Sequence, residues 1–303
     1  MSSMRSTGTV LCVASAAAFG AMAVFGKLAY DEGTTVGTLL AVRFALAAAL
    51  FWALVFLTGE HRRARGLGRR DVGIALALGA GGYALQAGCF FAALDRIDAS
   101  ILSLLLYTFP SMVAVTAIAL GRERADARRL VALGLASGGL VLVLATARAG
   151  ALDAAGAGLA LGAAIVYTTY ILSSQGIAGR VSPMLLSAVV CTGAAITLTI
   201  GSAALGELRP GEVTLAGWGW LLGIAVVSTV VAVSLFFAGL KRVGPTAASV
   251  LSTVEPVVTV VLAFLVFGEL LGSFQLLGGA LVILAVFVLA NQRPQNAPEG
   301  VPA

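Results

Sequence analysis

The chain has 303 residues, of which 59% are hydrophobic and 11% are charged. A soluble globular domain has roughly 45–50% apolar and roughly 25% charged residues, so the composition excludes a soluble globular protein of this size. The mean hydropathy of +1.02 predicts a membrane protein. The net charge of +5 does not indicate nucleic-acid binding, because the basic residues lie in short runs between apolar stretches.

Ten apolar stretches follow one another along the chain. A membrane-spanning helix needs about 20 mostly apolar residues, and the first stretch continues to Tyr30, which is too long for a signal-peptide core. The connectors are short and carry glycine, proline and nearly all the charge, so they leave no room for a soluble domain. The sequence therefore predicts an all-α integral membrane protein with ten transmembrane helices, at residues 8–30, 34–58, 71–94, 98–120, 128–147, 154–178, 183–206, 214–240, 245–267 and 273–291.

Lysine and arginine are unevenly divided between the two sides that these spans define. Fourteen of the 19 lie on the side that holds both chain ends, four lie on the other side, and Arg43 lies inside a span. Because cytoplasmic loops are enriched in basic residues, the sequence predicts a multi-pass protein of the cell inner (plasma) membrane with both termini in the cytoplasm. Residues 292–303 are polar and proline-rich, and we expect them to form a disordered cytoplasmic tail.

The two halves of the chain resemble each other. An ungapped shift of 146 residues superimposes identical residues at many positions, among them Phe90, Phe91, Pro110 and Glu123 on Phe236, Phe237, Pro256 and Glu269. Residues 1–150 and 151–291 each hold five predicted spans, and an odd number requires that the second half is inverted. Inverted repeats are typical of secondary transporters, with the substrate site at the repeat interface. We expect two inverted five-helix repeats around a central cavity.

Two stretches of sequence carry a family resemblance. AFGAMAVFGKLA, followed by Arg43 in LLAVRFALAAALF, resembles the opening of the drug/metabolite transporter superfamily, and in particular of its EamA-type members. VEPVVTVVLAFLVFGELLGSFQLLGGALVILAV resembles the closing pattern of that family, with a proline in the ninth span and a Gly-Glu pair at its end. The chain is most similar to the YddG-type amino-acid exporters. This resemblance implies export of amino acids and related metabolites, with aromatic amino acids among the expected substrates.

Two prolines lie in the middle of predicted spans. Pro110 and Pro256 cannot donate a backbone hydrogen bond, so the carbonyls of Leu106 and Ser252, four residues earlier, lose their helical partner. In hydrocarbon this is tolerated only where protein or water satisfies the carbonyl. We interpret both prolines as hinges beside the cavity. A static bend that only shapes the bundle is the alternative.

Two charged residues lie inside spans. Glu255 is the one acidic residue placed deep in a predicted span, where an ionisable group usually faces a partner or water. It is a candidate for binding a substrate ammonium or carrying a proton, and a structural hydrogen bond to a neighbouring helix is the alternative. Arg43 is a candidate partner for a substrate carboxylate or for Glu255. Alternatively, it caps helix carbonyls or pairs near the outer surface with Asp31 or Glu32.

Aromatic and neutral polar side chains within the spans complete the predicted substrate-binding site. A tyrosine hydroxyl inside the bilayer needs a hydrogen-bond partner, which a hydrated cavity supplies, while the ring offers a face to an aromatic or cationic substrate. Ordinary helix packing is the alternative. The predicted substrate-binding residues are Phe19, Tyr83, Gln86, Ser103, Tyr107, Tyr167, Tyr170, Ser252 and Glu255.

Glycines with a four-residue spacing indicate close packing between helices. Examples are Gly134 with Gly138 and Gly158 with Gly162.

Few other residues could carry chemistry. Three cysteines lie inside apolar stretches and the single His61 lies in a basic loop, which excludes a disulfide framework, most histidine-based triads and multi-histidine metal sites. No G-x-x-x-x-G-K-[ST] motif is present, which argues against direct use of ATP. We expect no enzymatic activity, metal or cofactor, and a monomer whose partners are a small-molecule substrate and the lipid bilayer.

The predicted function is therefore a secondary transporter that exports amino acids by alternating access. A carrier for another metabolite or drug, a channel and an intramembrane enzyme are the alternatives.

Overall fold

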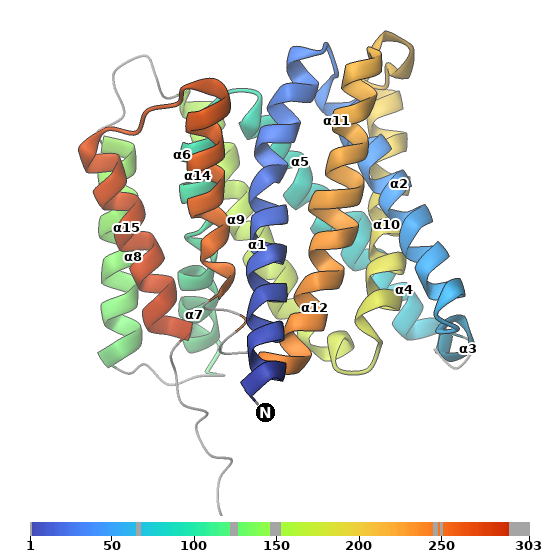
Figure 1. The fold of residues 1–303 in the computed structure, drawn as a ribbon, viewed down its shortest axis with the longest axis horizontal. Helices are drawn as coiled ribbons and strands as arrows, with labels where there is room; N and C mark the ends of the chain where they lie inside the picture. The colour runs from blue at the N-terminus through green and yellow to red at the C-terminus, as the bar shows by residue number, and fades with distance from the viewer. Residues whose placement is uncertain are drawn as a thin grey trace, which may run out of the picture.

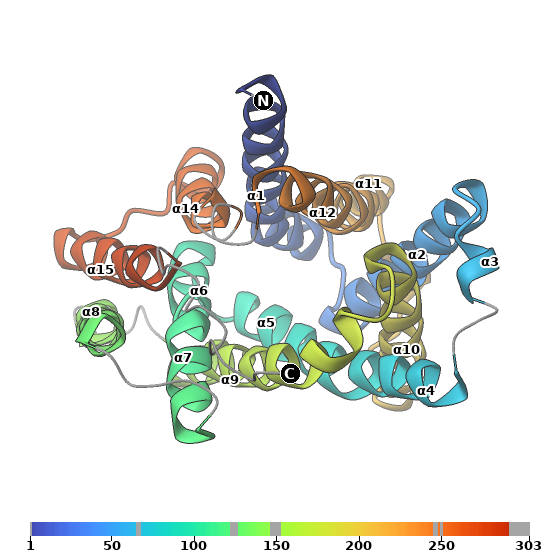
Figure 2. The same cartoon turned by 90° about the horizontal axis from the view of Figure 1, so that it is seen from below.

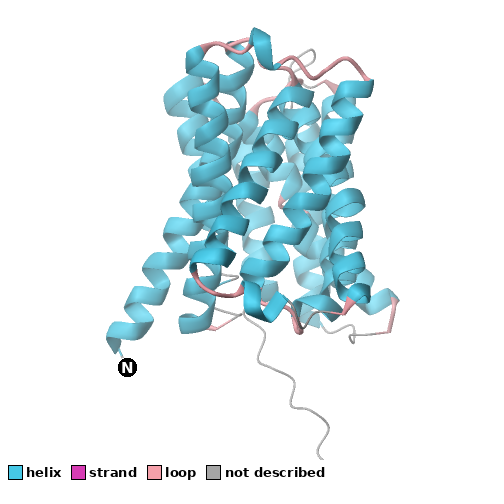
Figure 3. Ribbon diagram, turned by 90° about the vertical axis from the view of Figure 1, so that its right-hand side faces the viewer, coloured by secondary structure: helices cyan, strands magenta, loops and turns pink. Residues whose placement is uncertain are grey.

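The computed structural model describes residues 2–64, 68–121, 127–145, 153–244, 248 and 251–290. Figure 3 shows that the regular structure of this described part is helical, with short loops at both ends of the bundle. The predicted tail, 292–303, lies outside the described residues. The elements are, in chain order (Figure 1), α1 (Ser2–Asp31), α2 (Val36–Leu57), α3 (His61–Ala64), α4 (Arg69–Ala77), η1 (Leu78–Tyr83), α5 (Ala84–Leu94), α6 (Ala99–Leu106), α7 (Phe109–Ala119), α8 (Ala127–Ala145), α9 (Ala154–Ala178), α10 (Pro183–Ala204), η2 (Pro210–Glu212), α11 (Leu215–Ala225), η3 (Val226–Val231), α12 (Ala232–Val243), α14 (Val254–Phe267) and α15 (Ser273–Ala290).

Most of these helices have the length and composition of membrane spans. Three shorter apolar helices, Leu130–Val143, Val254–Phe267 and Ser273–Val288, lie within the predicted fifth, ninth and tenth spans. The all-helical, multi-pass membrane class predicted from composition is confirmed. Seven spans are long and apolar enough to cross a bilayer, namely Ser6–Asp31, Val36–Leu57, Arg69–Leu94, Ala99–Ala119, Ala154–Ala178, Pro183–Ala204 and Leu215–Val243.

The helices pack as long neighbouring pairs. Helix α2 packs along α10, α1 along α12 and α14, and α5 along α9. Seen along the bundle in Figure 2, these helices form a ring, and the pair α8 and α15 stands at one end of it. The ring places side chains from both halves of the chain around one centre.

Local sequence signals fix where several helices begin. The side chain of Asp153 accepts hydrogen bonds from the backbone of Ala155 and Gly156 and caps α9. Ser182 caps α10 in the same way and is followed by Pro183, whose missing donor costs nothing in the first helical turn. These caps satisfy amide groups that would otherwise be unpaired at the membrane edge.

Glycine lets α8 and α15 approach closely. A Cβ atom on Gly139 would lie 2.5 Å from the carbonyl oxygen of Gly278, and one on Gly278 would lie 2.6 Å from that of Gly139. The spacing-based prediction was wrong for Gly134, Gly138 and Gly158, because a Cβ on any of them would meet nothing within 4 Å, whereas one on Gly162 would lie 3.9 Å from Sγ of Cys89. Spacing within one helix therefore does not identify the contacting face.

The spans that contain the two prolines are interrupted. The predicted fourth span consists of α6, which ends at Leu106, and α7, which begins at Phe109 directly before Pro110. Helix α14 begins at Val254, two residues before Pro256. The predicted defects at both prolines are therefore present in the fold.

Two π-helical turns occur that the sequence did not predict. They are the six-residue elements η1 and η3, each in the middle of a long span, and both continue directly into the following α-helix. The hydrogen bonds of a π-turn span one residue more than those of an α-helix, so the helix is locally wider. Such turns are frequent at functional sites.

Candidate functional site

A cavity of about 620 Å³ lies at the centre of the ring of helices. Arg43 and Pro110 line it, whereas Pro256 is buried and is not among the lining residues. Its walls also hold every residue predicted from the sequence to bind substrate: Phe19, Tyr83, Gln86, Ser103, Tyr107, Tyr167, Tyr170, Ser252 and Glu255. The volume lies within the range of roughly 300–1,000 Å³ that is common for small-molecule sites.

The guanidinium of Arg43 is held on one wall of the cavity. The residue is 2% exposed, and its Nε donates to Oγ1 of Thr229 at 3.1 Å. The guanidinium carbon lies 4.8 Å from the centre of the Phe44 ring and 5.3 Å from that of Phe91. Thr229 belongs to the π-turn η3, and its hydroxyl donates to the carbonyl of Ile224, five residues earlier. The two aromatic faces and the Thr229 hydroxyl support this cation, and none of the ion pairs among the described residues involves it.

The carboxylates that the sequence offered as partners for Arg43 do not pair with it in the described part of the chain. Its pairing with a substrate carboxylate stays a prediction. Among the described residues, no ion pair joins Arg43 to Glu255, Asp31 or Glu32. Glu32 instead accepts a hydrogen bond from the hydroxyl of Thr214 at the end of the bundle. Arg43 lies about two turns into α2, and its side chain lines the cavity instead.

Glu255 lies on the cavity wall and contacts Tyr107. The Tyr107 hydroxyl is 2.9 Å from Oε2 of Glu255 and 2.8 Å from the carbonyl oxygen of Ser252. The latter is the carbonyl that Pro256 leaves without a helical donor, so the predicted need for a substitute partner is confirmed there. One hydroxyl has one proton, so it cannot donate fully to both acceptors. Both contacts are complete when Tyr107 donates to Ser252 and a protonated Glu255 donates to Tyr107.

Six aromatic rings form a continuous chain along the cavity. In the order Phe44, Tyr83, Tyr170, Tyr167, Phe109 and Tyr107, the centroids of successive rings lie 5.0, 5.8, 6.3, 4.6 and 5.9 Å apart. The chain begins beside the Arg43 guanidinium and ends beside Glu255. It therefore connects the cationic and anionic parts of the wall.

Sequence reasoning missed several cavity residues. Phe109 joins two tyrosines of the ring chain, and Thr229 positions Arg43. Phe90, Phe236 and Phe237 also line the cavity. The repeat already paired Phe90 with Phe236, so the internal symmetry was a signal that could have identified both.

A charged cluster closes the bundle at the end where α1 finishes. Nζ of Lys27 lies 2.7 Å from Oε1 of Glu269 and 3.6 Å from Oδ1 of Asp98. Glu269 also accepts hydrogen bonds from the backbone of Ala99 and from the backbone and hydroxyl of Ser100. Its carboxylate thus caps the start of α6 and joins α1, α6 and the segment after α14.

The pKa of Glu269 reflects this environment. Burial of the carboxyl favours the protonated form, but the hydrogen bonds from Lys27 and Ser100 and the charge of Lys27 outweigh it and lower the pKa below the ordinary glutamate value. The carboxylate is therefore charged at neutral pH. Its counterpart in the first half, Glu123, lies outside the described residues.

The chain is similar to known transporters over nearly its whole length. The model of the EamA-like transporter family matches it twice, at residues 6–145 and 154–291. The uncharacterized transporter YcbK of Bacillus subtilis is 28% identical over 277 residues, covering 89% of this chain and 88% of that protein. An uncharacterized transporter of Archaeoglobus fulgidus is 28% identical over 284 residues, covering 93% and 95%.

Two further similarities are more limited. The threonine/homoserine exporter RhtA of Escherichia coli is 33% identical over 138 residues, which is 44% of each chain. One crystal structure superimposes with a TM-score of 0.65 over 94% of this chain and 96% of its own, at 18% sequence identity. At that identity the superposition shows the fold alone.

Proposed function

Because the chain belongs to the EamA-like transporter family, we propose that it is a secondary transporter that exports amino acids across the inner membrane. One observation carries this proposal: Arg43 and Glu255 line the same cavity, and neither is paired with an opposite charge among the described residues. An amino acid at neutral pH carries one carboxylate and one ammonium. Its carboxylate would pair with Arg43 and its ammonium with Glu255, whereas a molecule with a single charge would leave one of these two buried charges without a partner.

The position of Tyr83 supports this pairing of charges. Its ring lies 5.0 Å from that of Phe44, which the Arg43 guanidinium faces, and 5.8 Å from that of Tyr170 in the chain of rings that leads to Glu255. The ring chain that runs between the two charges offers aromatic faces to a substrate side chain. We expect neutral amino acids to be carried, with aromatic ones among them. The partial similarity to a threonine/homoserine exporter supports amino acids as the substrate class.

Alternating access is supported by signs of two inverted halves. The family model matches each half once, and each half contains one π-turn and one span interrupted before a proline. Asp153, at the start of α9, forms an ion pair with Arg96. Two residues after Arg96, Asp98 lies 3.6 Å from Lys27, near the end of α1. Helix α9 therefore begins where α1 finishes, and the first helices of the two halves run in opposite directions. This arrangement supports the proposal of ten spans in two inverted halves, and the uneven distribution of basic residues supports a cytoplasmic location of both termini.

We assign Glu255 the role of proton carrier. In its protonated form, Glu255 completes the hydrogen bonds with Tyr107 and the Ser252 carbonyl, whereas the charged form is free to bind a substrate ammonium. Proton and substrate would thus compete for one carboxylate. Such competition couples the movement of a substrate to an opposite movement of protons.

The test is counterflow of labelled amino acids in liposomes that contain the purified protein. We expect saturable counterflow of phenylalanine and threonine, and a loss of at least tenfold in Arg43→Gln and Glu255→Gln. Arg209→Gln, at an exposed residue away from the cavity, should retain the full rate. Competition by a carboxylic acid without an amino group should depend on Arg43 alone, and competition by an amine without a carboxylate on Glu255 alone.

Other outcomes would assign a different function. Ohmic conductance without saturation would indicate a channel. Counterflow of a different metabolite, with no amino acid transported, would indicate another carrier of the same superfamily. Either result would overturn the proposal.

A further inference from the structure

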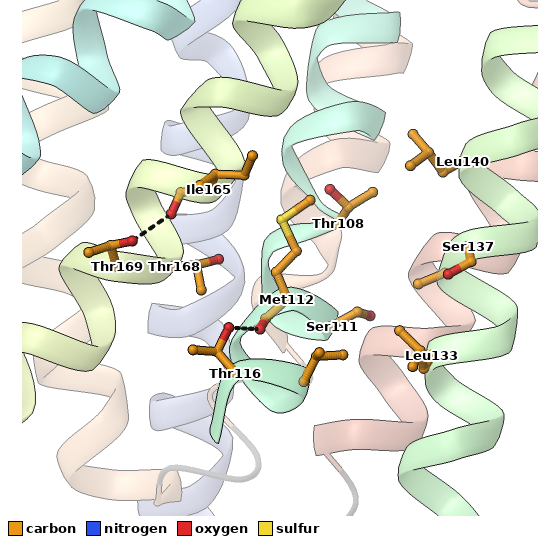
Figure 4. A pocket seen from close by; sticks show the side chains of 12 residues that line it. Thr108, Ser111, Met112, Thr116, Leu133, Ser137, Leu140, Ile165, Thr168 and Thr169 are labelled. Carbon is orange, nitrogen blue, oxygen red and sulfur yellow. Dashed lines mark hydrogen bonds between the residues drawn. The ribbon is translucent and has the colours of Figure 1, made fainter. Parts of the chain in front are cut away.

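A second pocket of about 340 Å³ lies on the far side of α7 from the central cavity. We call it the lateral pocket; it is formed by α7, α8 and α9, and it shares no lining residue with the cavity. Figure 4 shows Ser111 and Met112 of α7 between Thr168 of α9 and Ser137 of α8. The two spaces are separated by the contact of α7 with α9, where the Phe109 and Tyr167 rings lie 4.6 Å apart.

The lateral pocket is uncharged but rich in hydroxyl groups. Six of its twelve lining residues are serine or threonine, and none is ionisable. Thr108 and Thr168 lie near the middle of the spans Ala99–Ala119 and Ala154–Ala178. A charged headgroup would be costly at this depth, so the pocket suits an uncharged molecule.

The pocket contains a buried hydroxyl that lacks a partner. Ser111 is 4% exposed, and its Oγ has no hydrogen bond. An unpaired hydroxyl buried within a membrane protein costs free energy unless a ligand or water completes it. Ser111 therefore offers both a donor and an acceptor to whatever occupies the pocket.

The threonines of the pocket offer acceptors only. The hydroxyls of Thr108, Thr116, Thr168 and Thr169 each donate to a backbone carbonyl three or four residues earlier, at 2.7, 2.8, 2.9 and 3.1 Å. Their protons are engaged, while lone pairs on their oxygens remain available. A ligand must therefore donate to a threonine oxygen and accept from Ser111. An alcohol does both with one group.

The surroundings indicate how such a molecule would enter. Val115 is 39% exposed and Ile165 is 56% exposed, and both line the pocket on the outer surface of the helices. In a membrane span this surface faces lipid. A molecule dissolved in the bilayer can reach the pocket without passing through the central cavity.

From these observations we infer that the lateral pocket is a binding site for an uncharged alcohol with an apolar body, taken up from the bilayer. Its hydroxyl would meet Ser111, and its apolar part would contact Leu133, Leu140 and Met112. Thr108 lies in the interruption between α6 and α7, so an occupied pocket would restrain the segment that carries Pro110.

Photolabelling of the full-length protein in liposomes tests this inference without a transport measurement. The probes are an eight-carbon alcohol and an eight-carbon alkane, each with a diazirine at the same position, and labelled residues are mapped by mass spectrometry. We expect the alcohol to label α7 and α8 at the pocket at least fivefold more than the alkane does. Ser111→Ala should reduce the alcohol labelling at least fivefold, and Thr197→Ala, at an exposed residue of α10, should not change it.

A second variant fills the pocket from its exposed wall. Ser137→Phe changes a residue on the lipid side of α8, where folding tolerates a large apolar side chain, and it should also abolish the labelling. Equal labelling by alcohol and alkane, or labelling in Ser111→Ala within twofold of the unmodified protein, would overturn the inference. The space would then hold acyl chains without recognising a hydroxyl. Because no amino acid takes part, this result is independent of the proposed transport function.

Discussion

The ammonium of Lys27 lies 2.7 Å from a carboxylate oxygen of Glu269, 242 residues later in the chain. The Lys27 side chain is 22% exposed and that of Glu269 is 6% exposed, so water can replace little of this contact. The same carboxylate accepts three hydrogen bonds from Ala99 and Ser100. One side chain therefore fixes the relative positions of three helical segments at one end of the cavity.

Glu269→Gln should lower the stability of the folded protein by about 2 kcal/mol, because charge-assisted hydrogen bonds typically contribute about 1.5–3 kcal/mol each. Thermal unfolding in detergent measures the effect. Arg209→Gln is the matched control, since its pair with Glu212 is more than half exposed on both sides and should contribute less than about 1 kcal/mol. Equal losses in the two variants would contradict a special role for Glu269.

The stabilisation by Glu269 should depend on pH. Its pKa is lower in the folded protein than in the unfolded chain, so its contribution is fully present above the ordinary glutamate pKa of about 4.3. The contribution is lost as the pH falls from there through the folded-state pKa. The difference in unfolding temperature between the unmodified protein and Glu269→Gln should therefore be constant near neutral pH and narrow below about pH 4. A difference that stays the same in acid would disprove this linkage.

Sequence alone located most of the cavity wall but not its internal contacts. Tyr83, Tyr107, Tyr167, Tyr170 and Glu255 were recognisable because polar atoms within a membrane span are rare and need a partner. Which ring contacts which depends on how η1, α7 and α9 pack, and the sequence contains no signal for that. The hydrogen bond from Arg43 to Thr229 could not be predicted from the sequence for a related reason. A threonine in an apolar helix ordinarily bonds only to its own backbone, and the π-turn that presents it has no recognised sequence pattern.

Helix contacts were harder to predict than helix positions. Seven predicted spans correspond to described helices that are long and apolar enough to cross a bilayer, because about 20 apolar residues are required for that. Glycine spacing, in contrast, selected Gly134 and Gly138, whereas Gly139 is the residue at the crossing of α8 and α15. Adjacent positions on a helix point about 100° apart, so a pattern of glycines does not reveal which face meets a neighbour.

These adjacent glycines allow a direct comparison. Gly139→Ala would place a methyl group 2.5 Å from the backbone oxygen of Gly278, so α8 and α15 must separate. We expect a loss of about 1–3 kcal/mol or more, as for overpacking in a core. Gly138→Ala meets nothing within 4 Å and should be neutral or stabilise the helix by up to about 1 kcal/mol. Unfolding temperatures measured side by side decide between these expectations, and equal values would place the crossing elsewhere.

Glu255→Gln should remove the pH dependence of transport. A glutamine amide can donate to Tyr107 while Tyr107 donates to the Ser252 carbonyl, so the variant imitates the protonated form at every pH. Amino-acid flux into liposomes, measured from pH 6 to pH 8, should be lowered at least tenfold and should not vary with pH. Ser174→Ala is the control, because its hydroxyl bonds to the carbonyl of Ile171 in its own helix and the residue does not line the cavity. If both variants keep the pH profile of the unmodified protein, Glu255 is not the proton carrier.

Pro256→Ala should slow transport without weakening substrate binding. Alanine restores the backbone donor that a helix directs to the carbonyl of Ser252, which now accepts from Tyr107. The carbonyl would then accept from both donors through its two lone pairs, and the interruption before α14 would straighten. We expect the maximal rate of counterflow to fall at least fivefold and the half-saturating substrate concentration to change less than twofold. Pro210→Ala, in the exposed turn η2, should alter neither. If Pro256 only produces a static bend that shapes the bundle, it does not take part in the motion between the two states. Pro256→Ala would then lower the stability of the protein and leave the maximal rate of counterflow unchanged.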